Sequence, residues 1–339
     1  LDPDPHSPAG LVSHLHLCAD YLDPQALAQM AQQCAAITTE FENVPAQALA
    51  QLAQTRFVSP AAAAVAVAQD RAQEKAHFTH CGVPVAPHAV LASAADVAAV
   101  SEALLPGILK TARLGYDGKG QAVVRDRDSA FAAFEQLQGT GLIYEEFVPF
   151  DFEVSIIGAR SARGEIAIYP LNRNRHRDGI LRLTRAPWDA PSLQRNAASY
   201  LRRVLEHFRY VGVLNVEFFV RGGRLYANET APRVHNSGHW TIEGAATSQF
   251  ENHLRAILGL PLGSTAARAQ VAMINLIGTM PARDTVLGMP EAHWHDYGKE
   301  PRPGRKLGHI TLLASTATKR DSLARKLLRE IDPATSRNL

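Results

Sequence analysis

Helical and strand-like segments alternate along the first part of the chain. Residues 36–42 read as a strand, and Pro45 stands at the first turn of a helix over residues 46–53. Such alternation favours a parallel sheet covered by helices. Because 339 residues exceed what one compact core usually holds, we expect two or three domains.

The rest of the chain carries a mixed set of elements. We expect a helix over residues 70–81 that ends at Cys81-Gly82, and an amphipathic helix over residues 193–208. Further strands are expected at residues 107–114, 121–125, 142–147, 153–157, 165–170, 270–277 and 308–313, and further helices at 248–258 and 321–331. The expected domains are an N-terminal α/β domain over residues 1–69, a second domain over 70–263 and a smaller C-terminal domain over 264–339.

Composition and charge exclude several classes of protein. The chain has 35 basic and 33 acidic residues, and its net charge of +2 offers no general attraction to nucleic acid. Its longest apolar runs are far shorter than the roughly 20 residues that span a bilayer, and its first residues do not resemble a secretory signal. Cys18, Cys34 and Cys81 are too scattered for a disulfide framework. We therefore expect a cytoplasmic protein without a membrane or nucleic-acid partner.

A glycine-rich turn lies between two of the expected strands. It consists of Gly115, Tyr116, Asp117, Gly118, Lys119, Gly120 and Gln121. Its spacing matches neither a Walker loop nor a dinucleotide-binding fingerprint. Glycines let backbone N–H groups turn toward a ligand, and Lys119 adds a positive charge. Two interpretations stay open, a flap that closes over phosphates and an ordinary hairpin turn.

Two glutamates stand on opposite arms of an expected hairpin. If its turn centres on Gly223, as a three-residue loop would, Glu217 and Glu229 face each other with Cβ atoms roughly 5 Å apart. Such a pair of like charges requires a cation, and hard carboxylate oxygens beside Asn228 suit Mg²⁺. A two-residue turn would place the two glutamates on opposite faces instead. Solvent-exposed glutamates are also common in hairpins, so both interpretations stay open.

The densest polar stretch of the chain follows directly, at residues 233–240. Arg233 can hold an anion through two hydrogen bonds, and His235 and Asn236 supply directed ones. A binding site is therefore expected here. The spacing of His235 and His239 also suggests zinc, although a third ligand is not nearby in the sequence.

A basic stretch at residues 299–306 includes Lys299 and Arg305. Two prolines and a glycine stiffen this stretch and favour a fixed geometry over a flexible tail. It is either a site for an anion or an ordinary solvated loop.

Together these segments resemble the ATP-grasp superfamily and, within it, the 5-(carboxyamino)imidazole ribonucleotide synthase family of purine biosynthesis. The resemblance runs from about residue 1 to about residue 313. The segments at residues 233–240 and 302–308 are the most specific to this family. It implies an ATP-grasp fold of mixed α/β and α+β type. In such a fold the first strand and Gly-rich loop of the N-terminal α/β domain would be missing before Leu1.

The resemblance also implies roles for individual residues. Arg71 and Lys110 would contact the phosphates of ATP beneath the flap at residues 115–121. The remaining nucleotide contacts would be the adenine-binding hinge of Glu145, Glu146, Phe147 and Val148, then Glu153 on the ribose, His176 and Asn228. Glu217 and Glu229 would hold Mg²⁺. Around 5-aminoimidazole ribonucleotide and bicarbonate would lie Glu42, Tyr116, Lys119, Arg233, His235, Asn236, Lys299 and Arg305.

The implied reaction is an ATP-driven carboxylation. Bicarbonate is a poor electrophile because hydroxide would have to leave, so ATP phosphorylates it to carboxyphosphate before the amine of the ribonucleotide attacks the carbon. The implied cofactors are ATP and Mg²⁺, and the implied assembly is a homodimer. Two alternatives stay open, another ATP-grasp carboxylate–amine ligase and a nucleotide-binding relative without catalysis.

Overall fold

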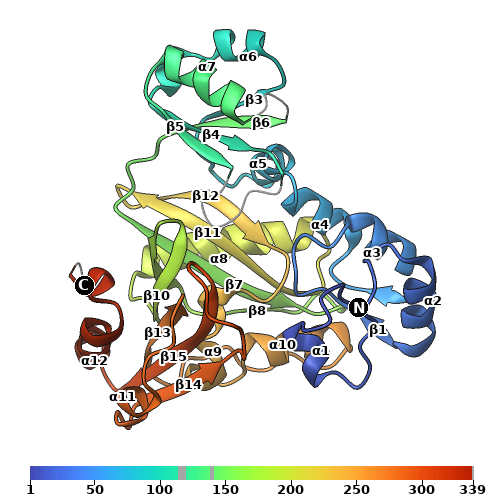
Figure 1. Ribbon diagram of the computed structural model, residues 1–339, viewed down its shortest axis with the longest axis vertical. Coiled ribbons are helices and arrows are strands. Elements are labelled where there is room, and N and C mark those ends of the chain that lie inside the picture. Colours follow the sequence, from blue (N-terminus) through green and yellow to red (C-terminus); the bar gives the residue numbers. More distant parts are fainter. Residues whose placement is uncertain (114–119, 138–140, 338–339) are drawn as a thin grey trace.

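The computed structural model describes residues 1–113, 120–137 and 141–337. Figure 1 shows three groups of elements. The N-terminal helices lie to one side, a four-stranded sheet with two helices projects from the body, and a nine-stranded sheet fills the centre. The mixed α/β and α+β fold class expected from the sequence is confirmed.

The N-terminal group is built around two very short strands. Its elements are α1 (Pro8–Val12), α2 (Pro24–Gln33), β1 (Ala36–Ile37), α3 (Ala46–Leu52), β2 (Phe57–Val58) and α4 (Ala62–Ala68). Strands β1 and β2 pair in parallel, as the alternation predicted, although β1 is shorter than the expected segment at 36–42. Leu27, Ile37 and Leu52 form the core beneath them.

The projecting lobe begins after α5 (Arg71–His80), which ends one residue before Cys81 as expected. It contains β3 (His88–Leu91), α6 (Ala94–Ala99), the 3₁₀ helix η1 (Glu102–Leu104), β4 (Gly107–Thr111), β5 (Gln121–Val124), α7 (Arg127–Gln136) and β6 (Leu142–Glu146). The antiparallel strands follow the order β3-β6-β4-β5, and α6 and α7 pack on one face (Figure 1). The expected strands on either side of the glycine-rich segment are present as the antiparallel pair β4 and β5, and most of the segment between them lies outside the described residues.

The central sheet joins strands from two expected domains. Its members are β7 (Phe152–Arg160), β8 (Ile166–Ile168), β9 (Asn172–Arg177), β10 (Ile180–Ala186), β11 (Gly212–Arg221), β12 (Arg224–Ala231), β13 (Gln270–Ile277), β14 (Ala292–Asp296) and β15 (Lys306–Ala314). The order is β12-β11-β7-β9-β10-β13-β15-β14, with β8 on β7. Because β13 pairs with β10, the C-terminal strands extend the central sheet.

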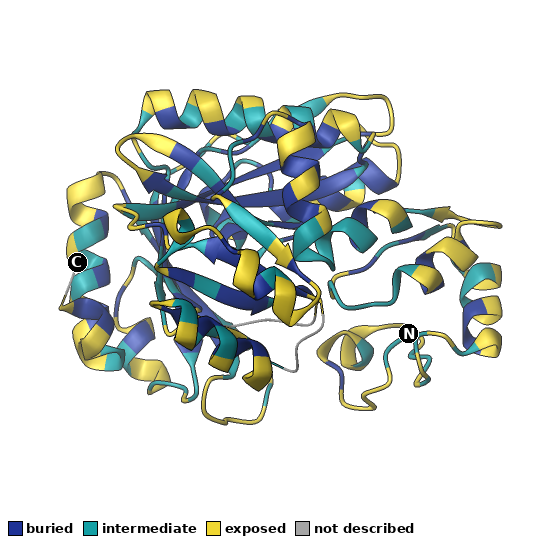
Figure 2. Cartoon of the chain, turned by 90° about the horizontal axis from the view of Figure 1, so that it is seen from above, coloured by how far each residue is buried: buried dark blue, intermediate teal, exposed yellow. Residues whose placement is uncertain are grey.

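Helices cover the central sheet and hold its core. They are α8 (Pro191–His207), the 3₁₀ helix η2 (Asn236–Gly238), α9 (Thr241–Gly244), α10 (Gln249–Ile257), α11 (Arg283–Leu287), α12 (Ala317–Ile331) and α13 (Pro333–Ser336). The predicted amphipathic character of α8 is confirmed, since Leu201, Val204 and Leu205 are all fully buried against the sheet. Figure 2 shows buried strands inside and exposed helical faces outside. None of the helices in the described part of the chain has the length and apolar character of a membrane span.

Candidate active site

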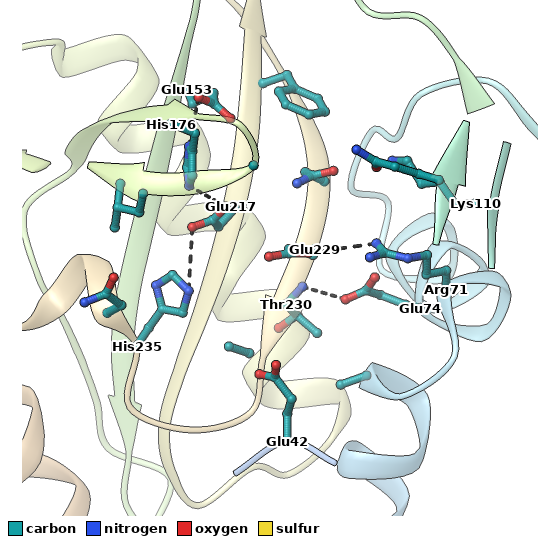
Figure 3. Close-up of a pocket in the computed structure, with 18 of the residues that line it drawn as sticks. Glu42, Arg71, Glu74, Lys110, Glu153, His176, Glu217, Glu229, Thr230 and His235 are labelled. Atoms are coloured by element: carbon teal, nitrogen blue, oxygen red, sulfur yellow. Dashed lines mark hydrogen bonds and ion pairs between the residues drawn. The ribbon is translucent and has the colours of Figure 1, made fainter. Parts of the chain in front are cut away.

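A pocket of about 450 Å³ lies where the projecting lobe, the central sheet and the N-terminal group meet. Its wall brings together many of the residues singled out in the sequence, namely Glu42, Arg71, Lys110, Gln121, Glu153, His176, Glu217, Asn228, Glu229, Arg233, His235 and Asn236. Figure 3 shows the labelled ones, such as Glu42, Arg71 and Glu217, converging from elements far apart in the sequence. A polar pocket with this many ionisable groups is a strong candidate for an active site.

The hairpin of β11 and β12 places its two glutamates side by side. Arg221 pairs with Arg224, so the turn is the two residues Gly222 and Gly223, both with positive φ. The three-residue turn considered from the sequence is therefore wrong. A β-bulge restores the predicted pairing: Phe218 faces Ala227, the register then shifts, and Glu217 faces Glu229.

The bulge leaves Asn228 outside the regular ladder of the hairpin. Its carbonyl oxygen lies 3.5 Å from the Lys75 ammonium, which comes from α5. Because the bulge keeps Glu217 and Glu229 on one face, both carboxylates belong to the pocket wall. The sequence thus suggested the observed pairing of Glu217 with Glu229, but on the assumption of a three-residue turn that the hairpin does not have.

Glu217 is surrounded by histidines. His176 Nδ1 lies 2.9 Å from Glu153 Oε2, and its Nε2 lies 4.0 Å from Glu217 Oε2. On the other side, His235 Nε2 lies 3.6 Å from Glu217 Oε1. Figure 3 shows the row from Glu153 to His235 across the pocket. Carboxylates and imidazoles thus alternate along one wall.

Burial and these neighbours shift the pKa values of the row. Burial raises the pKa of Glu217 to about 7. The charge of His176 acts to lower this pKa, whereas the charge of Glu229 acts to raise it further. Burial acts to lower the pKa of His176, but the hydrogen bond to Glu153 and the charge of Glu217 raise it to about 9. Burial, followed by the charge of Arg233, lowers the pKa of His235 well below its ordinary value. At neutral pH, His176 is therefore a cation and His235 is neutral.

The opposite end of the pocket is cationic. Arg71 Nη1 lies 3.9 Å from Glu229 Oε2, and Lys110 reaches the pocket wall from β4. Beneath the wall, Glu145 Oε2 forms ion pairs with the Nζ atoms of both Lys110 and Lys75, each at 3.2 Å. Burial acts to raise the pKa of Glu145, but Lys75 and then Lys110 lower it below its ordinary value. This arrangement fixes the ammonium of Lys110 beside the pocket.

A third region of the site lies next to the N-terminal group. Arg233 donates hydrogen bonds to Glu42 Oε2, one of them at 2.9 Å from Nε, and so connects the segment after β12 to the loop before α3. Asn236 and Asn275 exchange hydrogen bonds of 3.0 and 2.7 Å. Lys306 also lines the pocket. This end therefore presents directed donors and positive charge.

Several residues singled out in the sequence lie away from the described pocket wall. Gly120, Glu145, Glu146, Phe147, Val148, Lys299 and Arg305 are the described members of this group. Lys299 Nζ lies 5.5 Å from the centre of the Tyr297 ring, a cation–π distance, and Arg305 donates to the Glu300 carbonyl at 3.2 Å. Gly115, Tyr116, Asp117, Gly118 and Lys119 lie outside the described residues. The roles assigned to all of these residues stay predictions.

The structure adds site residues to which sequence reasoning assigned no role. Glu74 accepts a hydrogen bond from the backbone N–H of Thr230 at 2.5 Å, and burial raises its pKa to about 8. Lys75 is only 1% exposed and holds Glu145. The rings of Phe150 and Phe219 stack with their centroids 4.7 Å apart and form an apolar part of the pocket wall. A polar helix face is usually solvated, so only the tertiary packing of α5 shows that Glu74 and Lys75 are buried.

The donor set fits a magnesium ion. Glu217 and Glu229 offer hard carboxylate oxygens on one face, and a cation between them would favour the ionised form of Glu217, whose pKa burial raises to about 7. Among the described residues, no group of three or more histidine, cysteine, aspartate or glutamate side chains is arranged to hold a metal. The pair therefore suits an ion that takes further oxygens from a phosphate ligand. His235 and His239 therefore have no third ligand of this kind within the described part of the chain, and the zinc interpretation gains no support.

Comparison with known proteins agrees with the architecture. Residues 76–250 match the ATP-grasp domain, residues 1–69 match the ribonucleotide synthetase preATP-grasp domain, and residues 271–322 match the phosphoribosylaminoimidazole carboxylase C-terminal domain. With these domains, and with a carboxylate pair beside a cationic end of the pocket, the fold and site define an ATP-grasp enzyme.

Similar proteins narrow the class to one family. The N5-carboxyaminoimidazole ribonucleotide synthase of Pseudomonas aeruginosa is 49% identical over 313 residues, which cover 92% of this chain and 86% of that protein. The chain belongs to the N5-carboxyaminoimidazole ribonucleotide synthase family. The crystal structure of the synthetase from Thermus thermophilus matches with a TM-score of 0.92 and 48% identity, over 97% of this chain and 91% of that one. An Aspergillus clavatus synthase, solved with ADP and 5-aminoimidazole ribonucleotide, matches with a TM-score of 0.87 and 32% identity, over 97% and 90% of the two chains.

Proposed function

We propose that this chain carboxylates the amine of 5-aminoimidazole ribonucleotide with bicarbonate and hydrolyses ATP to ADP and phosphate. The single observation that carries the proposal is the pairing of Glu217 with Glu229, between a cationic end at Arg71 and Lys110 and a polar end at Arg233. Family membership supports the same reaction.

The pocket has a suitable place for each reactant. Arg71 and Lys110 would face the phosphates of ATP, and the apolar wall of Phe150 and Phe219 would lie against the nucleotide. Glu217 and Glu229 would hold Mg²⁺, which offsets negative charge on the phosphates when bound. Arg233 and Asn236 would orient the ribonucleotide and bicarbonate through directed hydrogen bonds. These assignments rest on where the side chains lie in the pocket.

The chemistry explains why these residue types are needed together. Bicarbonate oxygen attacks the γ-phosphorus of ATP, and the bond from that phosphorus to the bridging oxygen breaks, which releases ADP and forms carboxyphosphate. The amine nitrogen of the ribonucleotide then forms a bond to the carbon, phosphate leaves and the nitrogen loses a proton. Cationic side chains stabilise the charge that develops on the transferring group. The glycine-rich turn would exclude water from this reactive intermediate, a role that stays a prediction from the sequence.

The proposal is tested by measuring phosphate release with different acceptors. Purified enzyme with ATP, Mg²⁺ and bicarbonate should release phosphate when 5-aminoimidazole ribonucleotide is added. Formate with glycinamide ribonucleotide, or biotin with bicarbonate, should not replace that pair. Turnover with either of these combinations alone would refute the proposal, and ATP binding without acceptor-dependent phosphate release would favour a non-catalytic relative.

We also propose that the enzyme is a cytoplasmic homodimer. Cys18, Cys34 and Cys81 are all free thiols, which suits a reducing compartment. The dimer follows from the resemblance to the synthase family. Light scattering coupled to size-exclusion chromatography should give about twice the chain mass of 36.8 kDa.

A further inference from the structure

A chain of buried polar side chains lies directly behind His235. It consists of Ser155 on β7, Asn172 and Asn174 on β9, and Ser237 on η2. Ser155, Asn172 and Ser237 have no exposed surface, and Asn174 is 4% exposed. Because buried polar groups must satisfy one another, the direction of each hydrogen bond can be worked out.

The two asparagines have fixed orientations. The Trp240 indole can only donate, and its Nε1 donates to Asn172 Oδ1 at 2.9 Å. At Asn174, Thr184 Oγ1 donates to Oδ1 at 3.0 Å and Nδ2 donates to Ser155 Oγ at 2.9 Å. Both asparagines thus turn their amide nitrogens toward Ser155.

The two amide donors fix the direction in which the Ser155 hydroxyl donates its own proton. Ser155 Oγ accepts from Asn174 Nδ2 at 2.9 Å and from Asn172 Nδ2 at 3.4 Å, which occupies both of its lone pairs. The hydroxyl proton of Ser155 must then go to Ser237 Oγ, which lies 2.8 Å away. Ser237 is thereby left with its own hydroxyl proton to donate.

The last acceptor in the chain is His235 Nδ1. Ser237 Oγ lies 2.8 Å from it, and the backbone N–H of Ser237 points to the same atom at 3.3 Å. A backbone N–H can only donate, so Nδ1 carries no proton. The ring proton of His235 is therefore on Nε2, the nitrogen that faces Glu217 Oε1 at 3.6 Å (Figure 3).

We propose that the Ser155–Ser237 relay fixes His235 as the tautomer with its proton on Nε2, so that a ring N–H faces the Glu217 carboxylate at 3.6 Å and positions it electrostatically. A general base needs a free lone pair, and in this tautomer the lone pair of His235 is turned away from the pocket into the relay. His235 is therefore a positioning residue and not a proton acceptor in the reaction. The effect on Glu217 as a magnesium ligand rests on the proposed function, whereas the tautomer does not.

The tautomer can be measured directly by NMR on the full chain labelled with ¹⁵N-histidine, free of metal and nucleotide. The resonance of His235 is assigned by its loss in either His235→Gln or His235→Leu. We expect a protonated Nε2 and an unprotonated Nδ1 at neutral pH. A proton on Nδ1, alone or together with one on Nε2, would overturn the inference.

The positioning role is tested by comparing the same two variants. Leucine resembles histidine in size without the donor, whereas the glutamine side chain has an N–H of similar reach. We expect His235→Leu to raise the Mg²⁺ concentration needed for half-maximal phosphate release roughly tenfold or more, and His235→Gln to recover most of that loss. Equal losses in both variants, or no change in His235→Leu, would contradict the positioning role.

The His235 tautomer and the proposed reaction can be refuted independently of each other. A protein that shows the expected tautomer but has no ribonucleotide-dependent phosphate release supports the relay and refutes the proposed reaction. An active enzyme with the proton on Nδ1 refutes the relay and leaves the proposed reaction intact.

Discussion

Replacing Glu145 by glutamine should destabilise the protein far more than the same change at its neighbour Glu146. Glu145 is 3% exposed, and its Oε2 pairs at 3.2 Å with both Lys75 and Lys110. Lys75 and Lys110 are 1% and 8% exposed, so without the carboxylate two ammonium groups would share a buried space. Removing one partner of a buried ion pair costs about 3 to 5 kcal/mol. That loss is a large part of a typical total stability of about 5 to 15 kcal/mol.

Urea denaturation of Glu145→Gln and Glu146→Gln provides the measurement. Glu146 pairs with Arg221 at 3.8 Å on the surface, and such exposed pairs contribute at most about 1 kcal/mol. The free energy of unfolding falls by about 1 to 3 kcal/mol per molar urea. The urea midpoint of Glu145→Gln should therefore fall by about 1 M or more, whereas the midpoint of Glu146→Gln should fall far less. Adding Lys75→Met to Glu145→Gln should recover part of the loss, because one of the unpaired ammonium groups disappears.

The pH dependence gives a second check with a defined sign. The pKa of Glu145 is lower in the folded protein than its ordinary value, so its ionised form stabilises the fold. This contribution is complete above the ordinary glutamate pKa and is lost as the pH falls through the lowered value. The stability difference between wild type and Glu145→Gln should therefore shrink in acid. Equal midpoints for the two glutamine variants at neutral pH would refute the reasoning.

Three further outcomes are expected. Glu217→Gln should abolish phosphate release yet keep the fold. Because burial raises the pKa of Glu217 to about 7, ionisation destabilises the folded state as the pH rises, so this variant should gain stability over wild type between the ordinary glutamate pKa and pH 7 in urea titrations. Lys299→Ala should raise the KM for 5-aminoimidazole ribonucleotide more than the KM for ATP, and the reverse order in steady-state kinetics would place Lys299 at the nucleotide. Leu201→Ala should lower the free energy of unfolding by about 2 to 5 kcal/mol because Leu201 is fully buried, whereas the exposed neighbour Arg202 should tolerate alanine.

Elements with strong periodicity were predictable to within a few residues. Strand β13 has the predicted bounds, and α8 has the predicted amphipathic character. Strands β9 and β10 were not predicted, although β9 carries His176 into the pocket. Strand β9 consists entirely of asparagine, arginine and histidine, so it lacks the alternation of apolar and polar residues that identifies a half-buried strand. The pairing of β9 with β7 and of β10 with β13 decides the conformation of both strands.

The amino-acid sequence alone determined the strongly periodic elements, the presence of two glutamates in the hairpin and the resemblance of the polar segments to one enzyme family, because these depend on neighbouring residues and spacing. Only the tertiary structure decided that Asn228 forms a bulge, that Lys75 is buried against Glu145, and that a relay of hydroxyl groups ends at His235. The physical reason is that register, desolvation and hydrogen-bond direction are set by partners distant in sequence. A carboxylate or an imidazole acquires its protonation state from the groups that enclose it.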